Sequence, residues 1–190
     1  IDGIFFDEMS NDLALVGYYQ ALRDHVASRS ATARTIGNPG TPFTFDSSNG
    51  ASGHDVDDYA AVFDTLMTFE SDVTEYLNAY VAPTWAERVD ASRFAHVVHS
   101  VTSDADSKQA LTLSKQRKAG FVYLTHDVMP NPYDELSSRF ADERARLLAA
   151  NQAPPGQAVP IPGLALLAGL LGLLGGLLAR ARGARPGHGP

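Results

Sequence analysis

The chain has 190 residues, of which 44% are hydrophobic, and this suffices for one domain with a sizeable core and a short appendage. The net charge is −7, and the three arginines after residue 179 lie in a stretch without acids, so residues 1–179 carry −10. Such an acidic body argues against nucleic-acid binding through phosphate neutralisation. The absence of cysteine excludes disulfide frameworks, thiolate metal sites and cysteine nucleophiles.

The first stretch of the chain, Ile1 to Phe6, is a short apolar run that ends in two acids, Asp7 and Glu8. It predicts a buried strand with carboxylates at its carboxyl tip, where parallel α/β proteins assemble their active sites. Ordinary solvated acids that open a loop are the alternative. Because the chain begins inside this strand, we expect a longer parent protein, with further strands and an export signal upstream.

The next elements alternate between helix and strand. Apolar residues at helical spacing behind an Asn-Asp start predict a helix over residues 12–30, and a strand is predicted over 35–37. The Asn-Pro-Gly sequence of residues 38–40 predicts a turn. A long polar loop follows over 41–58, before a helical turn at 59–64.

The same alternation continues to residue 150. A strand over 65–69 ends directly before Glu70, and Ser71 or Asp72 is expected to cap the next helix. The remaining predicted elements are a helix to about residue 80, a strand over 94–100, a helix over 103–118 that Ser103-Asp104 caps, a strand over 121–125 and a helix over 133–150.

Five successive β/α units predict an α/β fold with parallel strands and right-handed crossovers. We interpret them as the carboxyl-terminal part of a TIM-type (β/α)8 barrel whose first three strands precede Ile1. An open doubly wound sheet is the alternative. The chain has no Gly-x-Gly-x-x-Gly sequence and no phosphate-binding Gly-Lys-Ser, which argues against a nucleotide-binding sheet and favours the barrel.

The carboxylates suggest glycoside hydrolysis, which needs one protonated carboxyl group and one ionised carboxylate on either side of the glycosidic bond. Asp7 and Glu70 come from different strand tips and can face each other across a cleft. Glu8 is a third candidate, although regular alternation turns it away from the face that Asp7 occupies. The apolar neighbours Phe69 and Met67 favour a raised pKa for Glu70 and a role as the acid.

The histidines of the 94–100 strand are three residues apart, so they face opposite sides and cannot form a one-sided metal pair. His99 is nearer the carboxyl tip and could hydrogen-bond a sugar hydroxyl, whereas His96 is expected in the core. Tyr123 and Thr125 share one face of the last strand. Tyr123 could stack on a sugar ring, although an aromatic residue in a strand more often belongs to the core.

Several short motifs resemble the spherulation-specific family of spherulin-4-like proteins over about residues 1–140. They are Gly3-Ile4-Phe5-Phe6-Asp7-Glu8, Asn38-Pro39-Gly40, Thr68-Phe69-Glu70, Val97-Val98-His99 and Val122-Tyr123-Leu124-Thr125-His126-Asp127, in this order. Members of that family are similar to (β/α)8-barrel glycoside hydrolases, some of which act on galactosamine-containing polysaccharides.

Carried over to this chain, the resemblance implies Asp7 and Glu70 as catalytic carboxylates, with Glu8 a close third. We expect no cofactor and no metal. The candidate substrate-binding residues are Asn38, His99, Tyr123, Thr125 and Asp127.

The last forty residues have a different composition. Residues 151–160 form a Pro/Gly linker, and residues 161–179 are an uncharged run long enough to span a hydrocarbon core of about 30 Å. Arg180, Arg182 and Arg185 then supply a positive cytoplasmic flank. This tail over 161–190 predicts a transmembrane helix and resembles bacterial carboxyl-terminal sorting signals of the PEP-CTERM kind, which a sorting protease removes. A buried core helix is the alternative.

Taken together, these features predict an exported or surface-anchored glycoside hydrolase in the bacterial envelope, whose partners are a polysaccharide substrate and the membrane, with no nucleic acid. A non-catalytic carbohydrate-binding or adhesion protein is the main alternative. A metal-dependent hydrolase is a distant third, disfavoured by the geometry of the histidines.

Overall fold

The computed structural model describes residues 2–40 and 56–151, which contain five strands in one parallel sheet. The strands are β1 (Gly3–Phe6), β2 (Arg34–Gly37), β3 (Thr65–Asp72), β4 (Phe94–His99) and β5 (Phe121–Leu124), and they are paired in this order. The fold class is therefore α/β, as predicted. A doubly wound sheet reverses its strand order at a switch point, whereas the sequential order found here is that of part of a (β/α) barrel.

Helices connect successive strands, since parallel neighbours in one sheet need a crossover connection. The α-helices are α1 (Val16–Arg29), α2 (Val56–Val62), α3 (Val73–Asn78), α4 (Asp104–Gln116) and α5 (Phe140–Asn151). Three 3-10 helices are described as well, η1 (Leu13–Leu15), η2 (Thr84–Arg88) and η3 (Ala91–Arg93).

Side-chain caps fix where several helices begin. Asp72 accepts hydrogen bonds from the backbone N–H groups of Thr74 and Glu75 at the start of α3. Ser103 accepts one from Asp106 at the start of α4, as its sequence predicted. These caps satisfy amide groups that have no partner within the helix. They place α3 and α4 directly behind the ends of β3 and β4.

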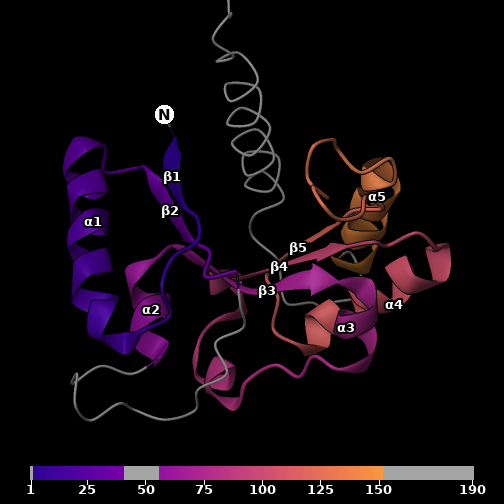
Figure 1. Ribbon diagram of the computed structural model, residues 1–190, viewed down its shortest axis with the longest axis horizontal. Coiled ribbons are helices and arrows are strands. Elements are labelled where there is room, and N and C mark those ends of the chain that lie inside the picture. Colours follow the sequence, from indigo (N-terminus) through magenta and orange to yellow (C-terminus); the bar gives the residue numbers. More distant parts are fainter. Residues whose placement is uncertain (1, 41–55, 152–190) are drawn as a thin grey trace, which may run out of the picture.

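Apolar packing between the sheet and its helices forms the outer side of the fold. One cluster joins α1 and α2 to the first strands through Tyr19, Tyr59 and Phe63. A second cluster joins α3 and α4 to β3, β4 and β5 through Phe69, Val98 and Leu124. Figure 1 shows α1 and α2 beside β1 and β2, and α3 and α4 on the side of β3 to β5.

The opposite face of the sheet carries a third, smaller cluster. Its buried members are Ile36, Met67, Ala95, Val97, Phe121 and Tyr123, with Phe5, Tyr133 and Phe140 packed against them. These positions alternate along the strands with those of the outer clusters, as the period of a strand requires. In a closed barrel this face would point toward the axis, and we call it the inner face.

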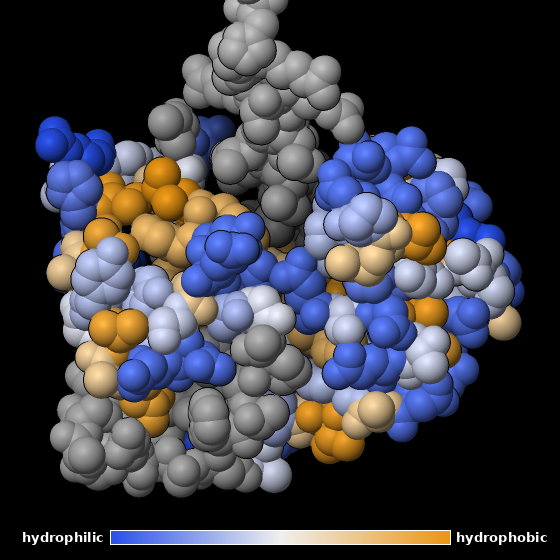
Figure 2. Space-filling view, viewed as in Figure 1, coloured by the Kyte–Doolittle hydropathy of each residue, from blue (hydrophilic) through white to orange (hydrophobic). Residues whose placement is uncertain are grey.

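Both edges of the sheet are open among the described residues, since β1 pairs with β2 and β5 pairs with β4. The apolar side chains of β1 are only half-buried. Figure 2 shows apolar surface on the side of the molecule where β1 and β2 lie, and a more hydrophilic surface over α3 to α5. Apolar side chains along an unpaired strand are a surface on which further strands could add.

Two predicted boundaries that bear on the site were wrong. The strand predicted over 65–69 continues to Asp72, so Glu70 lies within β3 rather than just after it. The helix predicted from residue 133 begins only at Phe140, because Tyr133 packs against the inner face and the backbone N–H of Ser137 donates to the hydroxyl of Tyr123. Residues 125–139 are therefore a loop, and its Tyr133 covers part of the inner face.

Two other predictions fall wholly or mainly on residues that the structure leaves undescribed. Most of the long polar loop lies in 41–55, and the predicted membrane span lies in 152–190. Within the described ranges, no helix is both long and apolar enough to cross a membrane.

Candidate functional site

Asn38 joins the two carboxylates that the sequence singled out. Its Nδ2 group donates to Oδ1 of Asp7 at 2.9 Å and to Oε2 of Glu70 at 2.7 Å. Asn38 is only 4% exposed, and its own Oδ1 accepts from the backbone N–H of Gly40 at 3.0 Å. The amide is thus held on both sides, and it brings the two acids together at the carboxyl ends of β1, β2 and β3.

Strand register explains why Asp7 and Asn38 meet. Phe5 pairs with Ile36 and Phe6 with Gly37, so the next residues, Asp7 and Asn38, continue on the inner face side by side. The backbone N–H of Asn38 also donates to the carbonyl of Phe6 at 2.8 Å. The turn that Asn38 opens is therefore tied to the end of β1.

A β-bulge in β3 turns Glu70 toward the same face. Met67 pairs with Ala95 and Phe69 with His96, so Thr68 has no partner residue in β4. Without this extra residue, Glu70 would alternate onto the outer side with Leu66, whereas the bulge places it beside Val97 on the inner face. The carbonyl of Thr68 accepts a hydrogen bond from the hydroxyl of Tyr80 at 3.3 Å, which helps to hold the bulge.

The bulge also changes the surroundings that were predicted for Glu70. Phe69 lies in the outer cluster between Tyr76 and Tyr80, with ring centroids at 4.7 and 4.6 Å. Glu70 is half-buried and faces the hydrogen-bond donor Asn38 instead. Phe69 therefore does not supply an apolar environment for Glu70. The predicted role of Glu70 as the acid rested partly on that environment.

Glu8 takes a different course from Asp7. Its φ of 49° lies in the left-handed region, and its backbone N–H donates to Oδ1 of Asp7 at 3.0 Å. The chain bends at this residue, and the two hydrogen bonds of the Asn38 amide go to Asp7 and Glu70. Glu8 is exposed beside the pair and stays a predicted third carboxylate.

His99 is the last residue of β4, and its ring contacts that of Tyr133. The two rings meet edge to face, with centroids 6.5 Å apart and an interplanar angle of 74°. Nδ1 of His99 lies 2.9 Å from the hydroxyl of Ser100. The hydrogen bond from the backbone N–H of Glu75 is the largest cause that lowers the pKa of Asp72, and His99 is a smaller one.

The sequence did not mark Tyr133 as a site residue, because its position resembled the start of the last helix. Pro130 and Pro132 just before it are the available signal that the segment is a loop. Burial, followed by the charge of Glu70, raises the pKa of Tyr133 far above its usual range, and a hydrogen bond with Glu70 contributes.

Tyr123, Thr125 and Asp127 lie together at the end of β5. Tyr123 and Thr125 are 6% and 0% exposed, and the Tyr123 hydroxyl accepts from the N–H of Ser137 at 3.0 Å. Stacking of Tyr123 on a sugar ring is therefore not available to the described conformation. The Thr125 hydroxyl accepts from the N–H of Asp127 at 3.1 Å.

One carboxylate oxygen of Asp127 accepts no hydrogen bond from the described residues. Oδ1 accepts from the N–H of Val128 at 3.0 Å, whereas Oδ2 is buried and has no hydrogen-bond partner among the described residues. Buried acceptors are usually satisfied, so Oδ2 is a candidate to receive a ligand hydroxyl. Its contact with a substrate stays a prediction.

His96 is a core residue, as predicted. It is 1% exposed, its Nδ1 lies 2.8 Å from the Tyr76 hydroxyl, and burial lowers its pKa to about 3. His96 and His99 thus lie on opposite faces of β4. No group of three His, Asp or Glu side chains that could hold a metal ion was found in the described ranges.

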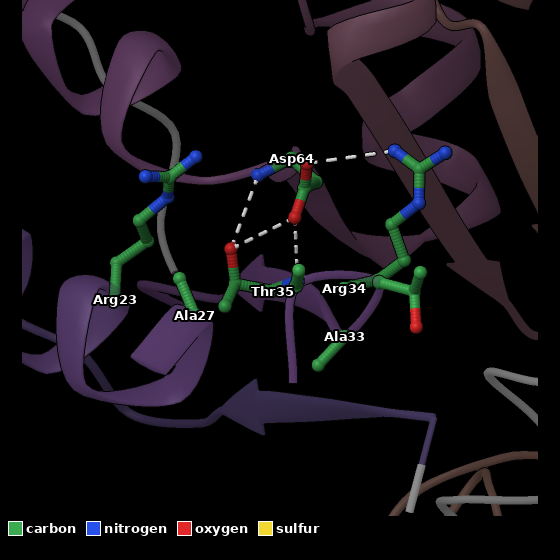
Figure 3. Close-up of a pocket in the computed structure, with 8 residues that line it drawn as sticks. Arg23, Ala27, Ala33, Arg34, Thr35 and Asp64 are labelled. Atoms are coloured by element: carbon green, nitrogen blue, oxygen red, sulfur yellow. Dashed lines mark hydrogen bonds and ion pairs between the residues drawn. The ribbon is translucent and has the colours of Figure 1, made fainter. Parts of the chain in front are cut away.

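The opposite end of the sheet has a cavity of about 330 Å³ near the start of β2. Figure 3 shows Arg23 on one side of it and Arg34 on the other, where Arg34 pairs with Asp64 at 3.4 Å. Asp64 also accepts from the N–H of Thr35 at 2.8 Å and from its hydroxyl at 3.2 Å. These polar groups bind one another and tie β2 to the start of β3, which is a structural role typical of the amino-terminal end of a barrel.

The fold and this site define a class of protein, a parallel α/β domain with a bridged carboxylate pair at the carboxyl ends of its strands. The model of spherulation-specific family 4 matches residues 1–145, so the chain belongs to this family. The chain is 25% identical over 158 residues to spherulin-4 of Physarum polycephalum, which covers 80% of this chain and 44% of that protein. The chain thus spans less than half the length of this relative, and no solved structure matches it.

Proposed function

We propose that the protein is a glycoside hydrolase that uses Asp7 and Glu70 as its carboxylate pair. The observation that carries this proposal is the bridge through Asn38, since one Nδ2 atom binds both carboxylates. Glycosidases need two carboxyl groups at a defined separation, with room for a sugar between or beside them. A structural ion pair would instead join each acid to a cation.

The geometry supports a retaining mechanism. Oδ1 of Asp7 and Oε2 of Glu70 lie 2.9 and 2.7 Å from the same nitrogen, Nδ2 of Asn38. The distance between these two oxygens therefore cannot exceed the sum of those two distances. That limit applies to the nearest oxygens of the two carboxyl groups, and it is compatible with the separation of about 5–5.5 Å in retaining enzymes. In this mechanism one carboxylate attacks the anomeric carbon while the other carboxyl group protonates the leaving oxygen.

The charge around the site favours a cationic or neutral sugar. Asp72 and Asp127 lie at the same ends of the strands as Asp7 and Glu70, whereas Arg23, Arg34 and Asp64 lie at the other end. Galactosamine residues of a polysaccharide are cationic when they are not acetylated, so a galactosamine-containing polysaccharide is our proposed substrate.

Hydrolysis of amino-sugar polysaccharides tests this function. The assay should use the complete gene product that contains this chain, because the chain spans less than half of its relative. We expect release of reducing ends from a galactosamine-containing polymer and no effect of a chelator. The absence of turnover across a broad panel of glycans, with binding retained, would favour the second candidate, a surface lectin that keeps the carboxylates as sugar ligands.

We also propose that residues 161–179 anchor the protein in a membrane or serve as a sorting signal that a protease removes. The support is the uncharged run followed by Arg180, Arg182 and Arg185. The arginines should stay in the cytoplasm, and the domain of residues 1–150 should lie outside, where an extracellular polysaccharide would meet it.

Protease added to intact spheroplasts should then digest the α/β domain and spare the arginine-containing tail. Protection of the domain until the membrane is opened with detergent would contradict both the orientation and the extracellular substrate. If a sorting protease removes the tail, mass spectrometry of the mature protein should find its carboxyl end before residue 161.

A further inference from the structure

His99 lies on the inner face of the sheet, one step beyond the level of Glu70. Glu70 pairs with Val97 of β4, and two residues further along both strands Asp72 pairs with His99. Since side chains two residues apart share a face of a strand, His99 points to the same side as Val97, which belongs to the inner-face cluster. Two residues advance a strand by about 6.5 Å toward its carboxyl end. The imidazole is therefore placed where a sugar bound over the carboxylates would extend.

One ring nitrogen of His99 is already occupied. Nδ1 lies 2.9 Å from the hydroxyl oxygen of Ser100. The ring also meets that of Tyr133 edge to face, with centroids 6.5 Å apart. Among the described residues no hydrogen bond to Nε2 is found, so Nε2 is the atom of His99 that is available to a ligand.

The contact between Ser100 and His99 requires an irregular backbone. Neighbouring side chains of a regular strand point to opposite faces, so Ser100 would point away from His99. Instead, the φ of Ser100 is 61°, in the left-handed region that is unfavourable for a residue with a Cβ atom. The N–H of Ser100 donates to the carbonyl of Asp127 at 2.8 Å, and the next N–H donates to the carbonyl of Thr125 at 2.9 Å. Hydrogen bonds to the end of β5 thus hold the strained conformation.

We propose that Ser100 is a positioning residue, whose hydroxyl fixes the orientation and the tautomer of the His99 ring and so presents Nε2 to a sugar hydroxyl. The hydrogen bond at one ring nitrogen of a histidine determines whether the other nitrogen carries the proton. Glycine would adopt the same φ without strain, so the backbone alone does not require a serine here. Strain retained beside a candidate site is typical of functional residues. The contact with sugar rests on the proposed function, but the positioning of His99 does not.

Two variants of Ser100 test the inference. Ser100→Ala removes the hydroxyl and keeps the strain, whereas Ser100→Gly removes both. Lys118→Gly is the matched control, because Lys118 has a φ of 62° and precedes the start of β5, at the other end of the sheet from His99. Since glycine accepts this φ, Ser100→Gly should fold even if Ser100→Ala does not.

The primary readout is NMR of the two ring nitrogens of His99 in the full chain, at about pH 9, where imidazole is neutral. We expect one dominant tautomer in the wild type, with two well-separated nitrogen resonances. In both Ser100 variants the separation should shrink, because the two tautomers interconvert when Nδ1 loses its partner. Lys118→Gly should give the resonances of the wild type.

Binding of a galactosamine polymer supplies the second readout. We expect its dissociation constant to rise by about three- to tenfold in both Ser100 variants, the size of one weakened hydrogen bond, and to stay unchanged in Lys118→Gly. A serine with only a structural role would change the melting temperature and leave the nitrogen resonances and the affinity alone.

The outcomes separate this inference from the proposed function. If the nitrogen resonances respond as expected but the wild type neither binds nor hydrolyses glycan, the proposed function fails and the positioning role stands. If His99 already interconverts between tautomers in the wild type, or if its nitrogens resonate identically in the wild type and Ser100→Gly, the positioning role is overturned.

Discussion

Glu70→Gln should lower kcat on the polysaccharide by about 10²–10⁴-fold and leave the affinity for it nearly unchanged. Gln has the shape of Glu and keeps an oxygen that can accept from the Asn38 amide, so the bridge to Asp7 is preserved. What the variant loses is the charge and the proton chemistry of one carboxyl group. The measurement is a comparison of kcat with the dissociation constant for the same glycan.

Glu87→Gln is the matched control, because Glu87 is exposed on η2, away from the carboxylate bridge. It should bind and turn over glycan like the wild type. If the wild type and Glu70→Gln bind glycan equally well and neither turns it over, the protein is a lectin. Equal turnover in both would remove Glu70 from the reaction altogether.

Most of the fold follows from local patterns in the sequence. Short, mostly apolar runs marked all five strands, and helical spacing between them required parallel crossovers. Asp12 and Ser103 were recognisable as caps, and each accepts a backbone hydrogen bond in the structure. Each of these signals acts within a few residues, so a single sequence contains it.

The orientation of Glu70 could not be predicted in this way. Strict alternation from Met67 puts Phe69 on the inner face and Glu70 on the outer face, which is the reverse of what the bulge produces. Thr68 carries no local mark of a bulge such as a glycine. The irregularity arises from the pairing with β4 and from the Tyr80 hydroxyl on the Thr68 carbonyl, and both depend on the tertiary structure.

The packing of Tyr133 against the inner face depends on tertiary structure too. Its loop is fixed by the contact between Ser137 and Tyr123, fourteen residues apart. The sequence could show the prolines that break a helix there, but not which face of the sheet the following ring would cover. Residues that a loop delivers to a site are difficult to find without the strands that support it.

Glu143 gives a second large expected effect, this time on stability. It is 5% exposed on α5, and its Oε1 has no hydrogen-bond partner within the described structure. Burial raises its pKa from 4.5 to about 7, although Arg139 and Arg146 partly oppose the rise. Its neighbour Phe140 packs on Tyr123 with ring centroids 6.4 Å apart, so this helix supports the inner face.

Proton linkage gives the direction in which the Glu143 carboxyl group changes the stability of the protein with pH. A carboxyl group with a folded-state pKa above its unfolded value binds a proton more tightly in the folded protein, so it favours folding when protonated. That contribution is fully present below pH 4.5 and is lost as the pH rises from 4.5 to about 7. Above pH 7 the folded protein must hold a buried charge with incomplete hydrogen bonding.

Glu143→Gln removes this charge and should stabilise the protein at pH 8 by about 1–3 kcal/mol, with little change at pH 4. Urea unfolding of the wild type and the variant at both pH values measures the difference. Glu87→Gln again serves as the control and should change the free energy of unfolding by less than about 0.5 kcal/mol at either pH. If the variant is equally or less stable than the wild type at pH 8, then Arg139 and Arg146 fully compensate the charge of Glu143. Ionisation of Glu143 would then not weaken the packing of α5 against Tyr123.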